Sequence, residues 1–107
     1  MPLNQVALMG TVASDIDMTY NANGLAITKF VLSTPAFGEK PPDKHNIVCF
    51  GKGSGDDGVA GYCAQYLTKG SRVVIQGRLI GQEFTPQSGK TFINSQVTAF
   101  SVEKIGD

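Results

Sequence analysis

The sequence predicts a small all-β protein with a single short helix, and three observations lead to this prediction. Glycine is frequent, with 13 in 107 residues, and it separates short apolar runs in the way that is typical of strands and tight turns. Most of these runs alternate apolar and polar residues, whereas one segment alone has helical spacing. The length is that of one domain, which we expect to span residues 1–107.

Three strands are predicted in the first half of the chain. The first covers residues 3–12, where apolar and polar side chains alternate and Gly10 in mid-run indicates a bend. The second covers 25–34 and follows a turn at 20–24 that has Asn-Gly at its tip. The third covers 44–52 and follows a loop that contains two consecutive prolines.

The one segment with helical spacing is 59–67. Its larger side chains recur at intervals of three and four residues and predict one buried face, which consists of Val59, Tyr62, Cys63, Tyr66 and Leu67. Asp56 or Asp57 can cap the start of this helix, and the pair Lys69-Gly70 is expected to close it.

Two long strands, 71–84 and 91–105, complete the chain and are joined by a hairpin turn at 85–89. The predicted element order is therefore β-β-β-α-β-β. This is the order of the OB-fold, a five-stranded, partly open Greek-key barrel that binds oligonucleotides on one face. Closure into a barrel also removes the exposed edges that five long strands would otherwise present.

The charge balance and the cysteines argue against several classes of protein. Nine Lys and Arg against nine Asp and Glu give a formal net charge of zero, which argues against a histone-like polycation. No apolar run approaches the ~20 residues of a membrane span, and the amino terminus lacks the basic region of a secretory signal. We therefore expect a cytoplasmic protein with no membrane contact. Cys49 and Cys63 have no metal-ligand spacing, so we expect two reduced, buried thiols and no metal or other cofactor.

Two features that could support enzymatic chemistry have simpler explanations. His45 is the only histidine and lies in a predicted strand, where packing or an interface is the commoner role. Gly53, Gly55 and Gly58 spell GxGxxG between a strand and a helix, the local context of a dinucleotide site. A dinucleotide-binding domain, however, needs several parallel strands with crossover helices and an acidic residue about 20 positions further on. We expect a flexible loop at this position, and a protein that is not an enzyme.

Cations and aromatic rings gather on one face of the third predicted strand and one face of the fourth. The third contributes Lys44, Asn46, Val48, Phe50 and Lys52, and the fourth contributes Arg72, Val74, Gln76, Arg78, Ile80, Gln82 and Phe84. Such faces, which we expect to be neighbours, suit single-stranded nucleic acid, because bases stack on rings while Lys and Arg follow the phosphates. Phe30 and Phe100 are assigned to the core, whereas Phe37 and Phe92 lie in or beside projecting hairpins, where packing explains a ring less well.

Four segments resemble the bacterial single-stranded DNA-binding protein family. LNQVALMG at 3–10 resembles the family's N-x-V-x-L-x-G start, and the stretch 15–32 resembles its D-P-E-x-R-Y segment with the F-x-L that follows. HNIVCFGK at 45–52 matches its third strand. YLTKGSRVVIQGRL at 66–79 resembles its most specific signature, Y-L-x-K-G-x-x-V-x-I-x-G-x-L. The resemblance covers residues 3–105.

The resemblance implies an OB-fold that binds single-stranded DNA without sequence preference in replication, recombination and repair. It implies base stacking by Phe50 and Phe84, and by Phe37 in the loop before the third strand. Lys44 stands where many members carry a stacking tryptophan, so fewer rings face the DNA than in those members.

The resemblance also implies a homo-oligomer, with a tetramer expected and a dimer as the alternative. His45 falls at a position of the family's subunit interface, and we add Val6 and Leu8 of the first strand to that interface. The sequence stops without the acidic, Phe-ended tail that recruits replication and repair proteins to family members, so we expect no tail-mediated partners.

We therefore predict a non-enzymatic single-stranded DNA-binding protein in which Phe37, Phe50 and Phe84 stack on bases. The predicted phosphate contacts are Lys44, Lys52, Arg72, Arg78 and Lys90. Two alternatives stay open: a tail-less dimer similar to primosomal replication protein N, and an OB-fold interaction module with weak nucleic-acid binding. Because the net charge is zero, we expect binding to depend more on stacking than on charge.

Overall fold

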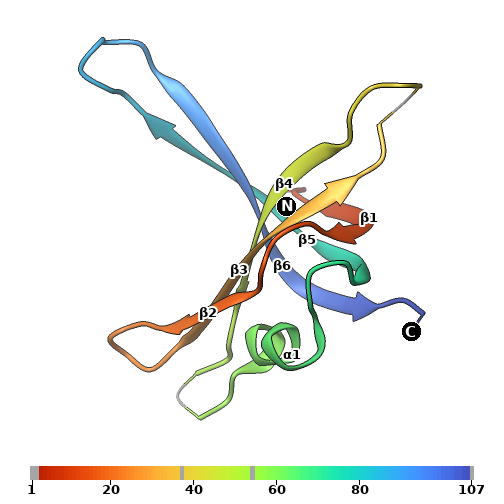
Figure 1. The fold of residues 1–107 in the computed structure, drawn as a ribbon. Helices are drawn as coiled ribbons and strands as arrows, with labels where there is room; N and C mark the ends of the chain where they lie inside the picture. The colour runs from red at the N-terminus through yellow and green to blue at the C-terminus, as the bar shows by residue number, and fades with distance from the viewer. Residues whose placement is uncertain (1–2, 37, 54, 107) are drawn as a thin grey trace.

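The computed structural model describes residues 3–36, 38–53 and 55–106, which form six strands and one helix (Figure 1). The strands are β1 (Val6–Val12), β2 (Asp17–Tyr20), β3 (Ala26–Thr34), β4 (Asp43–Phe50), β5 (Arg72–Phe84) and β6 (Phe92–Lys104), and the helix is α1 (Gly58–Tyr66). Among the described residues, no helix has the length and apolar character that crossing a bilayer requires.

Five of the strands close into a barrel, which confirms the predicted OB-fold. The sheet runs in the order β1-β5-β6-β4-β3-β2, and β1 also pairs with β3, so that the sheet closes on itself. All pairings are antiparallel except the one between β4 and β6. The hairpin of β5 and β6 extends far beyond the barrel, at the upper left of Figure 1.

The described residues contain six strands where five were predicted, and β2 is the additional one. It is only four residues long and pairs with β3 from Asp17↔Lys29 to Tyr20↔Ala26, outside the closed barrel. Its sequence, Asp-Met-Thr-Tyr, alternates polar and apolar side chains, but the strand is short and mostly exposed. Alternation over only four residues is at the lower limit of what indicates a strand, and this explains why β2 was not predicted.

Two glycines allow strands to approach closely where the barrel bends. A Cβ added to Gly10 would fall onto the backbone carbonyl of Ser33, where β1 passes from β5 to β3. A Cβ added to Gly77 would fall onto the carbonyl of Thr98, where the β5–β6 register shifts between Gln76 and Gly77. Gly10, where a bend was predicted, is therefore a point of close approach between β1 and β3, and an irregular register exists at Gly77.

The core consists of inward-facing side chains from the barrel strands together with one side of α1. Its largest fully buried apolar side chains are Val12, Leu32, Ile47, Ile75 and Val73. Phe30 is buried as predicted, and Cys49 and Cys63 are buried free thiols as predicted. The assignment of Phe100 to the core is wrong: Val97 and Ala99 face inward on β6, so alternation turns the Phe100 ring outward, where it is 55% exposed.

The helix begins and ends one residue earlier than predicted, and a different residue ends it. Ala60 and Cys63 are its buried residues, and Tyr66, predicted to be buried, is exposed. The carboxylate of Asp56 accepts a hydrogen bond from the Gly58 N–H at 3.1 Å, so this Asp satisfies a backbone donor at the start of α1. Leu67 ends the helix in an extended conformation, because its side chain turns into the core; Gly70 does not close the helix but lies in the turn before β5.

A buried hydroxyl fixes α1 on the barrel and supplies a stability test. The Thr28 hydroxyl of β3 donates a hydrogen bond to the Ala60 carbonyl at 2.8 Å, and Thr28 is fully buried. Thr28→Val keeps the shape but removes the donor, so we expect the free energy of unfolding to fall by about 1–2 kcal/mol in urea titrations. Thr11→Val, at an exposed position of β1, is the control and should change it by less than ~0.5 kcal/mol. Equal effects of the two substitutions would refute the role of this bond.

Candidate nucleic-acid interface

The strand register brings the outward side chains of β3, β4, β6 and β5 onto one continuous surface, which we call the outer face. Lys29 of β3 pairs with Val48 of β4, Val48 pairs with Thr98 of β6, and Thr98 pairs with Arg78 of β5. The side chains that alternate outward with these four are Val31, Lys44, Asn46, Phe50, Ile80, Gln82, Phe84, Phe92, Asn94, Gln96 and Phe100.

The predicted adjacency of the two cationic strand faces is wrong. They belong to β4 and β5, and β6 lies between these strands, parallel to β4 and antiparallel to β5. Strands that follow each other in sequence often pair, but a Greek-key barrel brings its last strand back between earlier ones. The central strand of the outer face is therefore β6, from which no residue was predicted to bind.

Four exposed phenylalanines form two pairs at opposite ends of this face. Phe84 and Phe92 are register partners at the far end of the β5–β6 hairpin, and their side chains are 54% and 51% exposed. Phe50 and Phe100 follow the paired residues Cys49 and Ala99 on β4 and β6, so they lie next to each other, 39% and 55% exposed. Phe92 and Phe100 were not among the predicted stacking residues.

The two pairs are separated by a polar stretch of β6. At ~3.3 Å per residue, Phe92 and Phe100 lie about 25 Å apart along the strand. Asn94, Gln96 and Thr98 point outward between them. Amide and hydroxyl groups can both donate and accept hydrogen bonds, so the stretch can adapt to different bases. This length is compatible with the ~4–16 nucleotides that an OB-fold typically covers.

The predicted cations are distributed unevenly over this surface. Arg78 lies at its centre and Lys44 is exposed at the start of β4. Lys52 follows the end of β4 and lines a hollow together with Phe100, and Lys90 lies in the hairpin turn between Phe84 and Phe92. These four cations therefore lie along or beside the outer face; Lys52 and Lys90 are near the aromatic pairs, and Arg78 and Lys44 lie between them.

Two of the residues predicted to contact DNA are not placed on the outer face by the described structure. Arg72 lies about 20 Å along β5 from Arg78, at ~3.3 Å per residue, and lines a separate hollow with Thr11 and Ser33. Phe37 lies outside the described residues. Lys29, in contrast, was not predicted to bind but lies on the outer face, and alternation on its strand is the signal that could have identified it.

A hollow of about 310 Å³ lies between β2, β3, β4 and β6, on the Lys29 side of the outer face. Its lining includes Asp15, Asp17 and Lys29, with Asn46 and Gln96 opposite and Val48 as well. Because carboxylates repel phosphates, this hollow suits the polar edge of a base better than the sugar-phosphate backbone.

The three residues of the predicted subunit interface are all partly buried in the single chain. Val6 and Leu8 are partly buried and pack against the core from β1. His45 is also partly buried, and its Nε2 lies 2.9 Å from the Thr34 hydroxyl. The interface itself stays a prediction.

The glycine-rich loop before α1 has an acidic rather than a phosphate-binding character. Gly53 and Asp56 exchange backbone hydrogen bonds in a tight turn, and the Gly58 N–H at the start of α1 is taken by the Asp56 carboxylate. Asp57 accepts a hydrogen bond from the Tyr20 hydroxyl at 2.9 Å, and this bond raises the pKa of Tyr20. Two carboxylates at a helix start oppose the binding of a pyrophosphate there.

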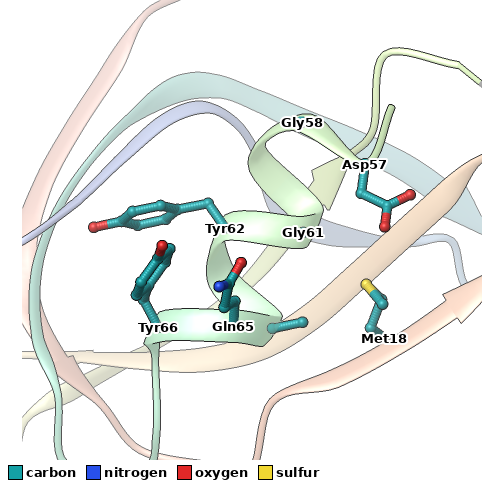
Figure 2. A pocket seen from close by; sticks show the side chains of 8 residues that line it. Met18, Asp57, Gly58, Gly61, Tyr62, Gln65 and Tyr66 are labelled. Carbon is teal, nitrogen blue, oxygen red and sulfur yellow. The ribbon is translucent and has the colours of Figure 1, made fainter. Parts of the chain in front are cut away.

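A larger hollow, of about 560 Å³, lies beside α1 and not on the outer face (Figure 2). Figure 2 shows Tyr62 and Tyr66 next to each other on the helix, with ring centroids 5.0 Å apart, and Met18 and Asp57 across the hollow. Its lining contains a carboxylate and no Lys or Arg, so it does not suit a nucleic-acid backbone. Among the residues that the structure describes, no group of three or more His, Cys, Asp or Glu side chains could hold a metal ion.

Comparison with known proteins gives a consistent set of matches. The model of the single-strand binding protein family matches residues 3–105. A single-stranded DNA-binding protein of Wolinella succinogenes is 32% identical over 103 residues, which cover 95% of this chain and 64% of the relative. One of Bacillus cereus is 35% identical over 106 residues, 94% of this chain and 59% of the relative. The chain thus spans less than two thirds of the length of these relatives.

A solved structure supports the same fold. The Plasmodium falciparum SSB complex with ssDNA superposes with a TM-score of 0.83 and covers 99% of this chain and 97% of the other, at 20% sequence identity. At this identity the similarity establishes the OB-fold architecture, and the choice of ligand has to be argued from the outer face.

Proposed function

Because the chain belongs to the single-strand binding protein family, we propose that it binds single-stranded DNA on its outer face, without sequence preference. The observation that carries this proposal is the pair of aromatic clusters, Phe50 with Phe100 and Phe84 with Phe92, at the two ends of one strand face. Exposed rings at both ends, with amides between them, form a platform for unpaired bases. The family description and the names of the relatives refer to binding, and none refers to a reaction.

Binding on this surface requires a strand whose bases are unpaired. Each base that stacks on a phenylalanine contributes about 1–3 kcal/mol, and every base has a face that can stack, so the interaction tolerates any sequence. Lys44, Lys52, Arg78 and Lys90 supply charge for the phosphates that follow the rings. In duplex DNA the bases are stacked on each other and cannot reach these rings. Duplex DNA therefore gains binding free energy only from the contacts between cations and phosphates.

We further propose the cellular setting that this activity implies. A single OB-fold domain would cover single strands exposed in replication, recombination and repair, in the cytoplasm and at the nucleoid. It would act as a homotetramer, with His45, Val6 and Leu8 near the subunit interface. Light scattering tests the assembly: four times the chain mass of 11.3 kDa supports it, and twice that mass favours a dimer similar to replication protein N.

A titration tests the proposed activity directly. The chain has no tryptophan, so the signal comes from the anisotropy of a fluorescein-labelled oligo-dT. We expect saturable binding to oligo-dT and much weaker binding to a duplex of the same length. Equal affinity for single strand and duplex, or no binding to either, would refute the proposal and would favour an interaction module instead.

The salt dependence of the same titration tests the contribution of Arg78. Each phosphate contact on a single strand adds about −0.7 to the slope of log K against log salt. Arg78→Gln should therefore make the slope less steep by ~0.7, because Arg78 lies at the centre of the outer face. Lys69→Gln removes an exposed charge in the turn after α1 and should leave the slope unchanged. If both variants changed the slope equally, Arg78 would act only through the overall charge of the protein.

A further inference from the structure

The two cysteines of the chain meet in the interior at the junction of α1 and the barrel. Cys49 faces inward on β4 and Cys63 faces inward on α1, and both side chains are fully buried. Their sulfur atoms lie 3.7 Å apart, close enough for one thiol to donate a hydrogen bond to the other. The proposed binding of DNA uses neither sulfur, because both lie on the inner side of the barrel wall.

We propose that Cys49 and Cys63 form an oxidation site, at which hydrogen peroxide converts the two thiols into an intramolecular disulfide that joins α1 to β4. The contact between the sulfurs carries this inference. It places the second thiol next to any oxidised form of the first, with no other side chain required to bring them together. The inference is independent of the proposed DNA binding.

The pKa values of the two thiols are shifted in opposite directions, and this suggests their roles. The hydrogen bond with Cys63 and burial both raise the pKa of Cys49. For Cys63, the hydrogen bond with Cys49 lowers the pKa and outweighs burial, which raises it. The thiolate is the form that attacks an oxidant, so Cys63 is the first to react and Cys49 is the resolving thiol.

The chemistry balances in two steps. The Cys63 thiolate attacks one oxygen of hydrogen peroxide, the O–O bond breaks, and a sulfenic acid and hydroxide form; the hydroxide takes up the proton that Cys63 has lost and becomes water. The Cys49 sulfur then attacks the Cys63 sulfur, the S–O bond breaks, and the hydroxyl leaves as a second water with the Cys49 proton. Two thiols are oxidised by two electrons in total, and one peroxide is reduced to two waters.

Access to the buried pair is provided by local opening of α1. The helix has nine residues, and only Ala60 and Cys63 among them are fully buried. Among the described residues, two side-chain hydrogen bonds join the helix to the barrel strands, from the Thr28 hydroxyl to the Ala60 carbonyl and from the Lys104 N–H to the Tyr62 hydroxyl at 3.2 Å. An element with so few buried contacts opens more readily than the strands beneath it, and peroxide is small enough to enter.

Peptide mass spectrometry after peroxide treatment tests the proposal. The protein is exposed to peroxide, remaining thiols are blocked with N-ethylmaleimide, and the chain is cleaved with trypsin without reduction. Cleavage after Lys44, Lys52 and Lys69 separates the cysteines into peptides 45–52 and 53–69. We expect these two peptides to be joined, with a mass two hydrogen atoms below their sum, and to separate on reduction. Analysis of peptides avoids interference from the exposed Met9, which also takes up oxygen.

Two alanine variants separate the roles of the thiols. In Cys49→Ala the resolving thiol is missing, so we expect Cys63 to keep one or two added oxygen atoms; it should react more slowly than in the unmodified sequence, because the hydrogen bond that lowers its pKa is lost. In Cys63→Ala we expect Cys49 to stay reduced and to react with maleimide after unfolding. Two results with the unmodified sequence would overturn the proposal. One is oxygen added to Cys63 without joined peptides. The other is the recovery of both cysteines as maleimide adducts, which means that peroxide left both thiols reduced. If a variant fails to fold, the presence or absence of joined peptides in the unmodified protein still tests the proposal.

Discussion

Replacing Phe84 by alanine is expected to weaken the binding of oligo-dT by about 5- to 150-fold, the equivalent of ~1–3 kcal/mol for one lost stacking contact. The side chain lies at the far end of the β5–β6 hairpin and is 54% exposed, so its removal leaves no cavity in the core. The loss should therefore occur in the dissociation constant and not in the unfolding midpoint. Anisotropy titrations and thermal unfolding of the same preparation measure both quantities.

The chain offers a closely matched control for this substitution. Tyr66 on α1 is 52% exposed but lies beside the hollow of Figure 2, away from the outer face. Tyr66→Ala removes an equally exposed ring and should leave the affinity within twofold. Phe92→Ala, at the register partner of Phe84, should behave like Phe84→Ala. An affinity unchanged in Phe84→Ala, in a protein that is still folded, would exclude base stacking at the hairpin.

The fold was largely predictable from the sequence because its signals are local. Alternation along β3 and β5 marks their inward side chains, and a change of spacing after the glycine-rich loop marks α1. Strand partners are not a local property. The parallel pairing of β4 with β6 brings residues such as Cys49 and Ala99 together from far apart in the chain, and no short pattern specifies it.

The same distinction explains which site residues were found. Phe50 and Phe84 could be predicted, because each shares a strand face with cations of its own strand. Phe92 needed the hairpin register, which pairs it with Phe84 across the turn. Phe100 was assigned to the core because it is apolar, although alternation with Ala99 already pointed it outward. The apolar side chains of a binding platform resemble core residues in composition, and only their position on the sheet separates them.

The position of Phe100 depends on the irregular register between β5 and β6. Gln76 pairs with Ser101 and Gly77 pairs with Ala99, so Phe100 has no partner on β5. At this point the strands approach so closely that a Cβ on Gly77 would meet the Thr98 carbonyl and the Cα of Ala99. Gly77 thus allows β6 to pair with β5 at this close distance and in this register, in which Thr98 faces outward.

Gly77→Ala is therefore expected to lower the free energy of unfolding by about 3 kcal/mol, because the added methyl group meets backbone atoms that cannot rotate away. Gly81→Ala is the matched control on the same strand, since its Cβ would make only an ordinary contact with Ile93 at 3.4 Å. That substitution should be neutral or stabilising by up to ~1 kcal/mol, because alanine restricts the unfolded chain more than glycine does. Urea denaturation of both variants measures the difference. If Gly77→Ala were as stable as Gly81→Ala, the close approach of β5 and β6 would not determine the register, and another interaction would have to place Phe100 beside Phe50.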